Sequence, residues 1–127
     1  MHQGKVRDTY AVDDETLLMV ATDRISAFDV ILPAGIPRKG QILNRISAFW
    51  FEKTKDIVPN HFLCLADSPD LKSNFGDNPL LATLPSEIAR QAMIVKRAER
   101  IDIECIVRGY ITGQAWLEYQ RNGTVWG

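Results

Sequence analysis

The first residues with types and spacing suited to chemistry lie at the start of the chain, in Gly4-Lys5-Val6-Arg7-Asp8. If residues 4–12 form a strand, Lys5 and Arg7 project from one face, about 7 Å apart along it. Glycine lets an anion approach the backbone, and two cations beside free N–H groups suit a polyphosphate. A solvent-exposed edge strand with two basic residues would have the same pattern, so both interpretations stay open.

A second polar group lies in the segment from Asp23 to Asp29, which also contains Ser26. Two carboxylates, a serine and an arginine cluster there around a small residue, which makes the segment a candidate for chemistry. Alternatively, Asp23 and Ser26 could cap a turn and have no other role.

A third group combines Glu104 and Arg108, just before Gly109, with Lys96 on the preceding predicted strand. A guanidinium donates two parallel hydrogen bonds, which suits a carboxylate or a phosphate. The pair could line a cleft, but the charged face of a strand normally faces water, so a solvated surface is the alternative.

Periodicity predicts the elements that must position these groups. Alternating or continuous apolar runs predict strands over 4–12, 16–22, 61–66, 91–98 and 102–109, the first two forming a hairpin, and 23–29 is expected to be a polar loop. Apolar residues at three- and four-residue steps predict a helix over 40–56, and a short helix is expected over 111–121. The first helix carries one apolar stripe formed by Ile42, Leu43, Ile46, Phe49, Trp50 and Ile57. The proline-rich stretch 67–85 is expected to be a loop.

Composition excludes several classes of protein. The 127 residues are 46% hydrophobic, which is too apolar for a disordered chain, and no apolar run approaches the roughly 20 residues of a membrane helix. The 15 basic residues balance 16 acidic ones, which argues against nucleic-acid binding. Cys64 and Cys105 are expected to be buried thiols in a reducing compartment, so the cytoplasm is the expected location.

Both ends of the chain suggest a piece of a longer protein. Charged residues of functional type begin at position 5 without a preceding strand, and Asn122-Gly123 is typical of a hairpin turn whose second strand is missing. We therefore expect a fragment, with a short protein that has a frayed tail as the alternative.

Several segments together, in this order, strongly resemble one family: Gly-Lys-Val-Arg-Asp-Thr-Tyr (4–10), Thr-Asp-Arg-Ile-Ser-Ala-Phe-Asp-Val-Ile-Leu (22–32), Ile-Ser-Ala-Phe-Trp-Phe (46–51), Val-Pro-Asn-His (58–61) and Glu-Cys-Ile-Val-Arg-Gly-Tyr-Ile-Thr-Gly (104–113). The series resembles phosphoribosylaminoimidazole-succinocarboxamide synthase, or SAICAR synthetase, over about the first half of a typical member. The resemblance implies an α+β fold with an antiparallel β lobe of kinase-like or ATP-grasp type and a flanking helix. Residues 1–101 would form this nucleotide-binding lobe, and 102–127 would begin a second, substrate-binding lobe.

The resemblance also implies an ATP-dependent carbon–nitrogen ligase of purine biosynthesis. It would join L-aspartate to carboxyaminoimidazole ribotide through an acyl phosphate, with Mg²⁺ accompanying ATP, and a homo-oligomer is compatible with it. The family's magnesium-binding acids lie later than residue 127, so no metal ligand is expected in this chain, and the chain alone should be inactive. The alternative is a non-catalytic nucleotide-binding lobe that needs a partner.

Residue roles follow from the matching positions. The ATP phosphates would be bound by Gly4, Lys5, Val6, Arg7 and Asp8, with Asp8 orienting the loop, and the adenine by a hinge of Lys96, Arg97 and Ala98. The ribotide would be bound by Glu104, Arg108, Gly113 and Gln114, and a mobile loop with Asp23, Ser26 and Asp29 would close on the ribotide or the aspartate. Gln114 departs from the family, which usually has serine there to help bind the ribotide phosphate.

Overall fold

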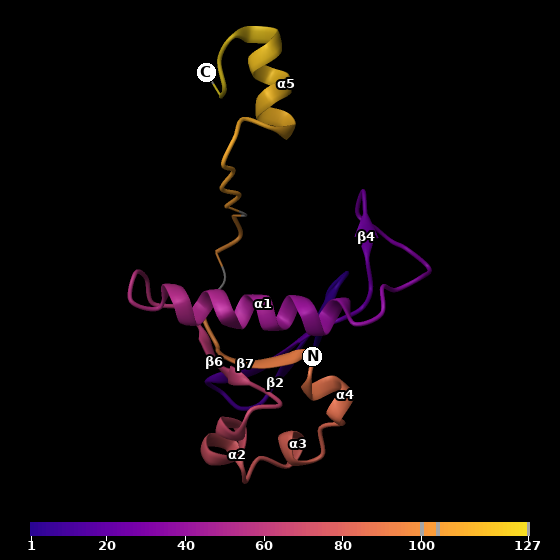
Figure 1. Cartoon of the computed structure of the whole chain (residues 1–127), viewed down its shortest axis with the longest axis vertical. Coiled ribbons are helices and arrows are strands. Elements are labelled where there is room, and N and C mark those ends of the chain that lie inside the picture. Colours follow the sequence, from indigo (N-terminus) through magenta and orange to yellow (C-terminus); the bar gives the residue numbers. More distant parts are fainter. Residues whose placement is uncertain (100, 104, 127) are drawn as a thin grey trace.

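A computed structural model describes residues 1–99, 101–103 and 105–126, and its main feature is a five-stranded antiparallel sheet. The strand order is β1-β2-β3-β7-β6, with β1 at His2–Gln3, β2 at Arg7–Ala11, β3 at Thr16–Ala21, β6 at Phe62–Leu65 and β7 at Ala92–Lys96. Helix α1 (Lys39–Thr54) covers one face, and α2 (Pro69–Phe75), α3 (Pro79–Ala82) and α4 (Ser86–Ala89) cover the other (Figure 1). The expected combination of helices with an antiparallel sheet is confirmed.

The predicted hairpin over 4–22 is confirmed, because β2 and β3 pair antiparallel with Arg7 opposite Ala21. Asp13 closes the connecting turn, since its Oδ1 accepts hydrogen bonds from the N–H groups of Glu15 (2.8 Å) and Thr16 (2.7 Å). Side chains alternate along a strand. Arg7 therefore lies on the α1 face of the sheet, and its neighbour Asp8 lies on the opposite face.

The hydrophobic core lies between the sheet and α2, α3 and α4, around buried residues such as Leu18, Ile94 and Leu81. The prediction of a loop over 67–85 is therefore wrong, because this stretch contains α2 and α3. Each helix has proline at its first position, where no N–H group is needed, and the Asn78 side chain accepts hydrogen bonds from the first turn of α3. Helices of one or two turns are stabilised by packing rather than by periodicity, which hid them in the sequence.

The predicted helix over 40–56 is confirmed as α1, but its expected apolar stripe does not face the sheet. The buried residues are Gly40, Asn44 and Ala48, spaced four apart, whereas Ile46 and Trp50 are exposed, Trp50 by 59%. A Cβ atom at Gly40 would lie 2.0 Å from the carbonyl oxygen of Ala21 in β3. Small residues thus let the helix backbone lie close against the sheet, although Leu43 of the expected stripe does line a cavity between α1 and the sheet.

The predicted strand over 102–109 is wrong, because the described residues of this segment form no strand and Ile103 and Val107 are exposed. β7 already lies between β3 and β6, so the residues that follow it cannot fold back and pair with β7 as a hairpin would. The chain instead extends away from the sheet (Figure 1). Cys105 is therefore exposed, contrary to expectation, whereas Cys64 is buried as expected.

The predicted helix over 111–121 is confirmed as α5 (Gly113–Asn122), which stands apart from the sheet (Figure 1). The hairpin expected at Asn122-Gly123 is wrong. Gly123 ends α5 in a left-handed conformation (φ 70°) and donates its N–H group to the carbonyl of Tyr119 at 2.8 Å, a common helix ending. In the part of the chain that the structure describes, no helix is long and apolar enough to cross a membrane.

Candidate functional site

The turn between β1 and β2 contains the glycine of the first chemical motif. The N–H group of Gly4 donates to the carbonyl of Arg7 at 2.7 Å, which closes the turn. A Cβ atom at position 4 would lie 2.8 Å from that same oxygen, closer than side chains tolerate. The tight turn therefore requires glycine, and it places Lys5 and Val6 at its tip.

Arg24 holds this turn from the side of Asp8. Its guanidinium donates to the carbonyl oxygens of Gly4 (3.0 Å) and Lys5 (3.1 Å), and to both carboxylate oxygens of Asp8 (3.1 and 2.5 Å). The hydrogen bonds to Asp8 raise the pKa of Arg24 above its ordinary value. Asp8 is only 9% exposed, so the ion pair is largely shielded from water. Asp8 is thus linked to the turn through Arg24.

The second motif serves partly as a structural connection. The carboxylate of Asp23 accepts hydrogen bonds from the N–H groups of Arg38 (2.9 Å) and Gly40 (2.8 Å) at the start of α1. These contacts match the capping alternative for Asp23, since the first N–H groups of a helix have no partner within it. Capping occupies both carboxylate oxygens in the structure.

Ser26 and Asp29 lie in a small hairpin that follows Asp23. Ser26 belongs to β4 (Ser26–Ala27), which pairs with β5 (Val30–Ile31), and Asp29 lies in the turn between them at φ 66°. The ammonium of Lys5 lies 2.5 Å from the Asp29 carboxylate and lowers the pKa of Asp29. The structure therefore brings the loop of the second motif next to the turn of the first.

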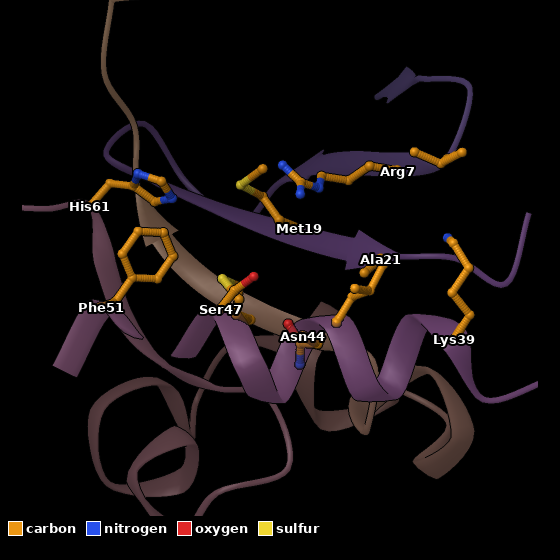
Figure 2. A pocket seen from close by; sticks show the side chains of 11 residues that line it. Arg7, Met19, Ala21, Lys39, Asn44, Ser47, Phe51 and His61 are labelled. Atoms are coloured by element: carbon orange, nitrogen blue, oxygen red, sulfur yellow. The ribbon is translucent and has the colours of Figure 1, made fainter. Parts of the chain in front are cut away.

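A cavity of about 100 Å³ lies between the sheet and α1 (Figure 2). It is lined by Val6, Arg7, Met19, Ala21, Lys39, Leu43, Asn44, Ser47, Phe51, His61 and Met93. Within the described residues the guanidinium of Arg7 has neither a hydrogen bond nor an ion pair. Burial, together with the positive charge of Arg7, lowers the pKa of His61. An unpaired cation beside an apolar slot suits a ligand with an anionic group and an apolar ring.

Two further polar groups complete the α1 side of this cavity. Lys39 donates to the carbonyl oxygens of Thr22 (3.1 Å) and Arg24 (2.9 Å), so it holds the loop that follows β3. Asn44, which is 2% exposed, donates through Nδ2 to the carbonyl of Ala92 at 2.9 Å, while its Oδ1 is buried without a partner in the described residues. A ligand or a water molecule could supply the missing donor.

The predicted adenine hinge begins at the end of β7, but its first backbone donors are occupied. The N–H group of Lys96 donates to the carbonyl of His61 at 2.8 Å, and that of Arg97 to the carbonyl of Glu15 at 2.6 Å. A backbone N–H donor to a base would therefore have to come from Ala98 or beyond.

The predicted ribotide residues gather elsewhere. Arg108 donates to the hydroxyl of Thr112 at 3.3 Å, and its guanidinium lies 3.5 Å from where a Cβ at Gly113 would be, an ordinary contact distance. Gln114 lines the same hollow as Arg108. Glu104 lies outside the described residues. This hollow lies beside α5, away from the sheet, so the structure does not bring the third motif to the first two (Figure 1).

Side chains that could bind a metal ion are scattered over the described part of the chain. Of the residues described, no three or more His, Cys, Asp or Glu side chains are grouped so that they could hold a metal ion.

Comparison with known proteins decides the family. The family model described as SAICAR synthetase matches residues 1–125. The chain belongs to the SAICAR synthetase family. It is 46% identical over 127 residues to the phosphoribosylaminoimidazole-succinocarboxamide synthase of Nitrosomonas europaea and 49% identical over 127 residues to that of Chromobacterium violaceum. All of this chain is matched, against 40% and 42% of the two relatives, so it spans about two-fifths of their length.

Solved structures of the SAICAR synthetase family share the fold. The SAICAR synthase of Saccharomyces cerevisiae, solved in complex with SAICAR, superposes with a TM-score of 0.76 at 41% identity, covering 98% of this chain and 42% of the yeast chain. A type-2 SAICAR synthetase solved in complex with ADP superposes with a TM-score of 0.54 at 21% identity, over 76% of this chain and 32% of that one. The second likeness shows the fold alone.

Four residues near the first motif were not assigned a role from the sequence: Arg24, Lys39, Asn44 and His61. Arg24 and His61 lie within segments that resemble the SAICAR synthetase family, at 22–32 and 58–61, and this was the available signal. Lys39 and Asn44 carry no such signal, because only the packing of α1 against the sheet brings them to the cavity.

Proposed function

We propose that this chain supplies the nucleotide-binding part of an ATP-dependent ligase that joins L-aspartate to carboxyaminoimidazole ribotide. The observation that carries the proposal is the guanidinium of Arg7, which lies unpaired among the described residues at a cavity next to the Gly4 turn. Membership of the SAICAR synthetase family supports the reaction, and a protein of the same fold has been solved in complex with ADP. Both cysteines are free thiols, which agrees with a proposed site of action in the cytoplasm.

The proposed reaction has two steps. A carboxylate oxygen of the ribotide attacks the γ-phosphorus of ATP, and the bond to the ADP oxygen breaks, which leaves an acyl phosphate. The aspartate amine then attacks the acyl carbon, phosphate departs with the electron pair of the broken C–O bond, and the nitrogen loses a proton. Both steps require that phosphate charge be neutralised and that water be excluded. Mg²⁺ is proposed to enter with ATP.

This chain would meet the first requirement at the β1–β2 turn. Lys5 and Arg7 supply two cations, and Gly4 lets the phosphates approach the backbone. The cavity that Met19 and Met93 line would accommodate the base. The base would be directed toward Ala98, just after β7. This arrangement is the proposed kinase-like one, with the nucleotide lying between the β lobe and a second lobe.

The ribotide is proposed to bind at the hollow beside Arg108 and Gln114. The guanidinium of Arg108 suits an anionic group, and Gln114 lines the same hollow. The hollow lies away from the β lobe in this structure, so the second lobe must approach the sheet before the two substrates can react.

Calorimetric titration of the folded chain with Mg·ADP tests the nucleotide site. We expect saturable binding that Arg7→Ala weakens by at least about 10-fold, because a charge-assisted hydrogen bond contributes about 1.5–3 kcal/mol. Arg121→Ala, which removes an exposed cation of α5, is the matched control and should leave the affinity unchanged. Equal affinity of the wild type and the folded Arg7→Ala variant would reject the assignment of Arg7.

Nucleotide binding alone does not separate a ligase from a non-catalytic lobe that needs a partner. Release of ADP from ATP that depends on both aspartate and the ribotide separates them. The measurement is made with the chain joined to, or mixed with, the remainder of a relative's sequence. Release without aspartate dependence would contradict the ligase.

A further inference from the structure

The contacts of Arg24 fix the direction of two peptide groups at the tip of the β1–β2 turn. Its guanidinium donates hydrogen bonds to the carbonyl oxygens of both Gly4 and Lys5, at 3.0 and 3.1 Å. In a planar trans peptide the C=O and the following N–H point in opposite directions. Because both carbonyls point toward Arg24, the N–H groups of Lys5 and Val6 point away from it.

These two N–H groups have no acceptor in the part of the chain that the structure describes, although the neighbouring Gly4 N–H and Val6 carbonyl are both hydrogen-bonded. Two adjacent unpaired amide donors form a small concave site suited to an anion. Arg24 lies on the Asp8 face of the sheet, so the two amides are directed toward the opposite face, which carries the side chain of Arg7. The backbone donors and the cation are thus arranged around one space.

Other contacts hold the Arg24 side chain in place. Its remaining hydrogen bonds run to both carboxylate oxygens of Asp8, whose side chain is 13% exposed, and the Arg24 side chain is 28% exposed. The preceding residue, Asp23, caps α1, so the same loop is anchored to the helix that forms the other wall of the cavity. The turn is therefore held relative to α1 through the pair Asp23 and Arg24.

We propose that Arg24 is a positioning residue that directs the N–H groups of Lys5 and Val6 at the nucleotide phosphates, and thereby sets phosphate affinity without touching the phosphates. Arg24 fixes this orientation through its hydrogen bonds to the two carbonyl groups, and the Asp8 carboxylate holds the guanidinium in place. The proposal rests on the proposed nucleotide site.

The test compares three probes that share parts of the nucleotide: Mg·ADP, inorganic tripolyphosphate and adenosine. Titrations follow the backbone amide signals of wild type and Arg24→Ala by ¹H–¹⁵N NMR. In the wild type we expect large shifts of the Lys5 and Val6 amide signals with Mg·ADP and tripolyphosphate, and small ones with adenosine. Arg24→Ala should weaken both phosphate probes about 10-fold and leave adenosine unchanged, and Arg24→Lys should recover part of the loss.

Arg45→Ala is the matched control, because it also removes an arginine–aspartate ion pair, with Asp67, but on the far side of α1. It should change none of the three affinities. A variant that is merely destabilised would lose adenosine along with the phosphates, which would overturn the positioning role. Wild-type binding of Mg·ADP without shifts at Lys5 and Val6 would overturn it too, even if Arg24→Ala fails to fold. If the wild type binds no probe, the nucleotide function falls as well, whereas equal Mg·ADP affinity in Arg24→Ala rejects only the role of Arg24.

Discussion

The guanidinium of Arg7 and the imidazole of His61 line the same cavity, although 54 positions separate them in the sequence (Figure 2). Arg7 is the first residue of β2, whereas His61 directly precedes β6, an edge strand that β3 and β7 separate from β2. The Arg7 charge and burial both disfavour the imidazolium, so the pKa of His61 lies below its usual value of 6.5. His61 is thus a natural reporter of charge in the cavity.

An anionic ligand at Arg7 should raise the pKa of His61. Neutralising the guanidinium removes the repulsion that acts on the imidazolium. The expected result is an upward shift of the His61 titration midpoint, followed by NMR, when tripolyphosphate is added. No shift at saturating tripolyphosphate would place the anion away from Arg7.

The lowered pKa of His61 also predicts how stability depends on pH. The unfolded chain binds a proton at His61 near pH 6.5, but the folded chain does so only at lower pH. This contribution to the free energy of unfolding is therefore fully present above pH 6.5 and is lost as the pH falls through the folded pKa. Denaturant melts of the wild type and His61→Gln between pH 7.5 and 5 measure it, and the variant should show the smaller decline; equal slopes would contradict the prediction.

Removal of the α1 cap should destabilise the chain. Asp23→Ala leaves the N–H groups of Arg38 and Gly40 without their acceptor, which costs about 1–2 kcal/mol in the free energy of unfolding. Urea denaturation measures the loss. Asp77→Ala removes an exposed carboxylate between α2 and α3 and is the control. Equal midpoints for the two variants would show that the cap contributes nothing.

The close approach of α1 to β3 should make Gly40 intolerant of any side chain. In Gly40→Ala the new methyl group would lie 2.0 Å from the Ala21 carbonyl oxygen, so the helix must shift, at a cost of about 1–3 kcal/mol or more. Gly109→Ala is the matched control, because a Cβ there meets nothing within 4 Å. Thermal unfolding followed by circular dichroism should show a lower midpoint for Gly40→Ala alone.

Gln114→Ser should keep or improve affinity for the ribotide. Gln114 lines the hollow beside Arg108, where the SAICAR synthetase family usually has serine, and a shorter side chain leaves more room for a phosphate. Calorimetric titration with carboxyaminoimidazole ribotide measures the change. A marked loss of affinity would mean that the Gln114 amide itself contacts the ligand.

Helices and strands that depend on a local sequence pattern were predictable. Which face of each element is buried was not always predictable. The hairpin of β2 and β3 follows from strand alternation around an aspartate turn, and α1 from helical spacing. The same spacing suggested that Ile46 and Trp50 are buried, but the buried residues of α1 are Gly40, Asn44 and Ala48. Periodicity marks an apolar face without identifying what covers it, and a row of small residues can pack closer to a sheet.

The sequence by itself determined the family and most of the strands, because these depend on residue identity and short-range spacing. It could not show that the second motif caps α1 through Asp23 and holds the turn through Arg24, since both contacts join segments 15 or more residues apart. It also suggested a strand at 102–109 beside the strand before it, but β3 and β6 already occupy both sides of β7. Only the tertiary structure decided these points, because they depend on which chain segments pack side by side.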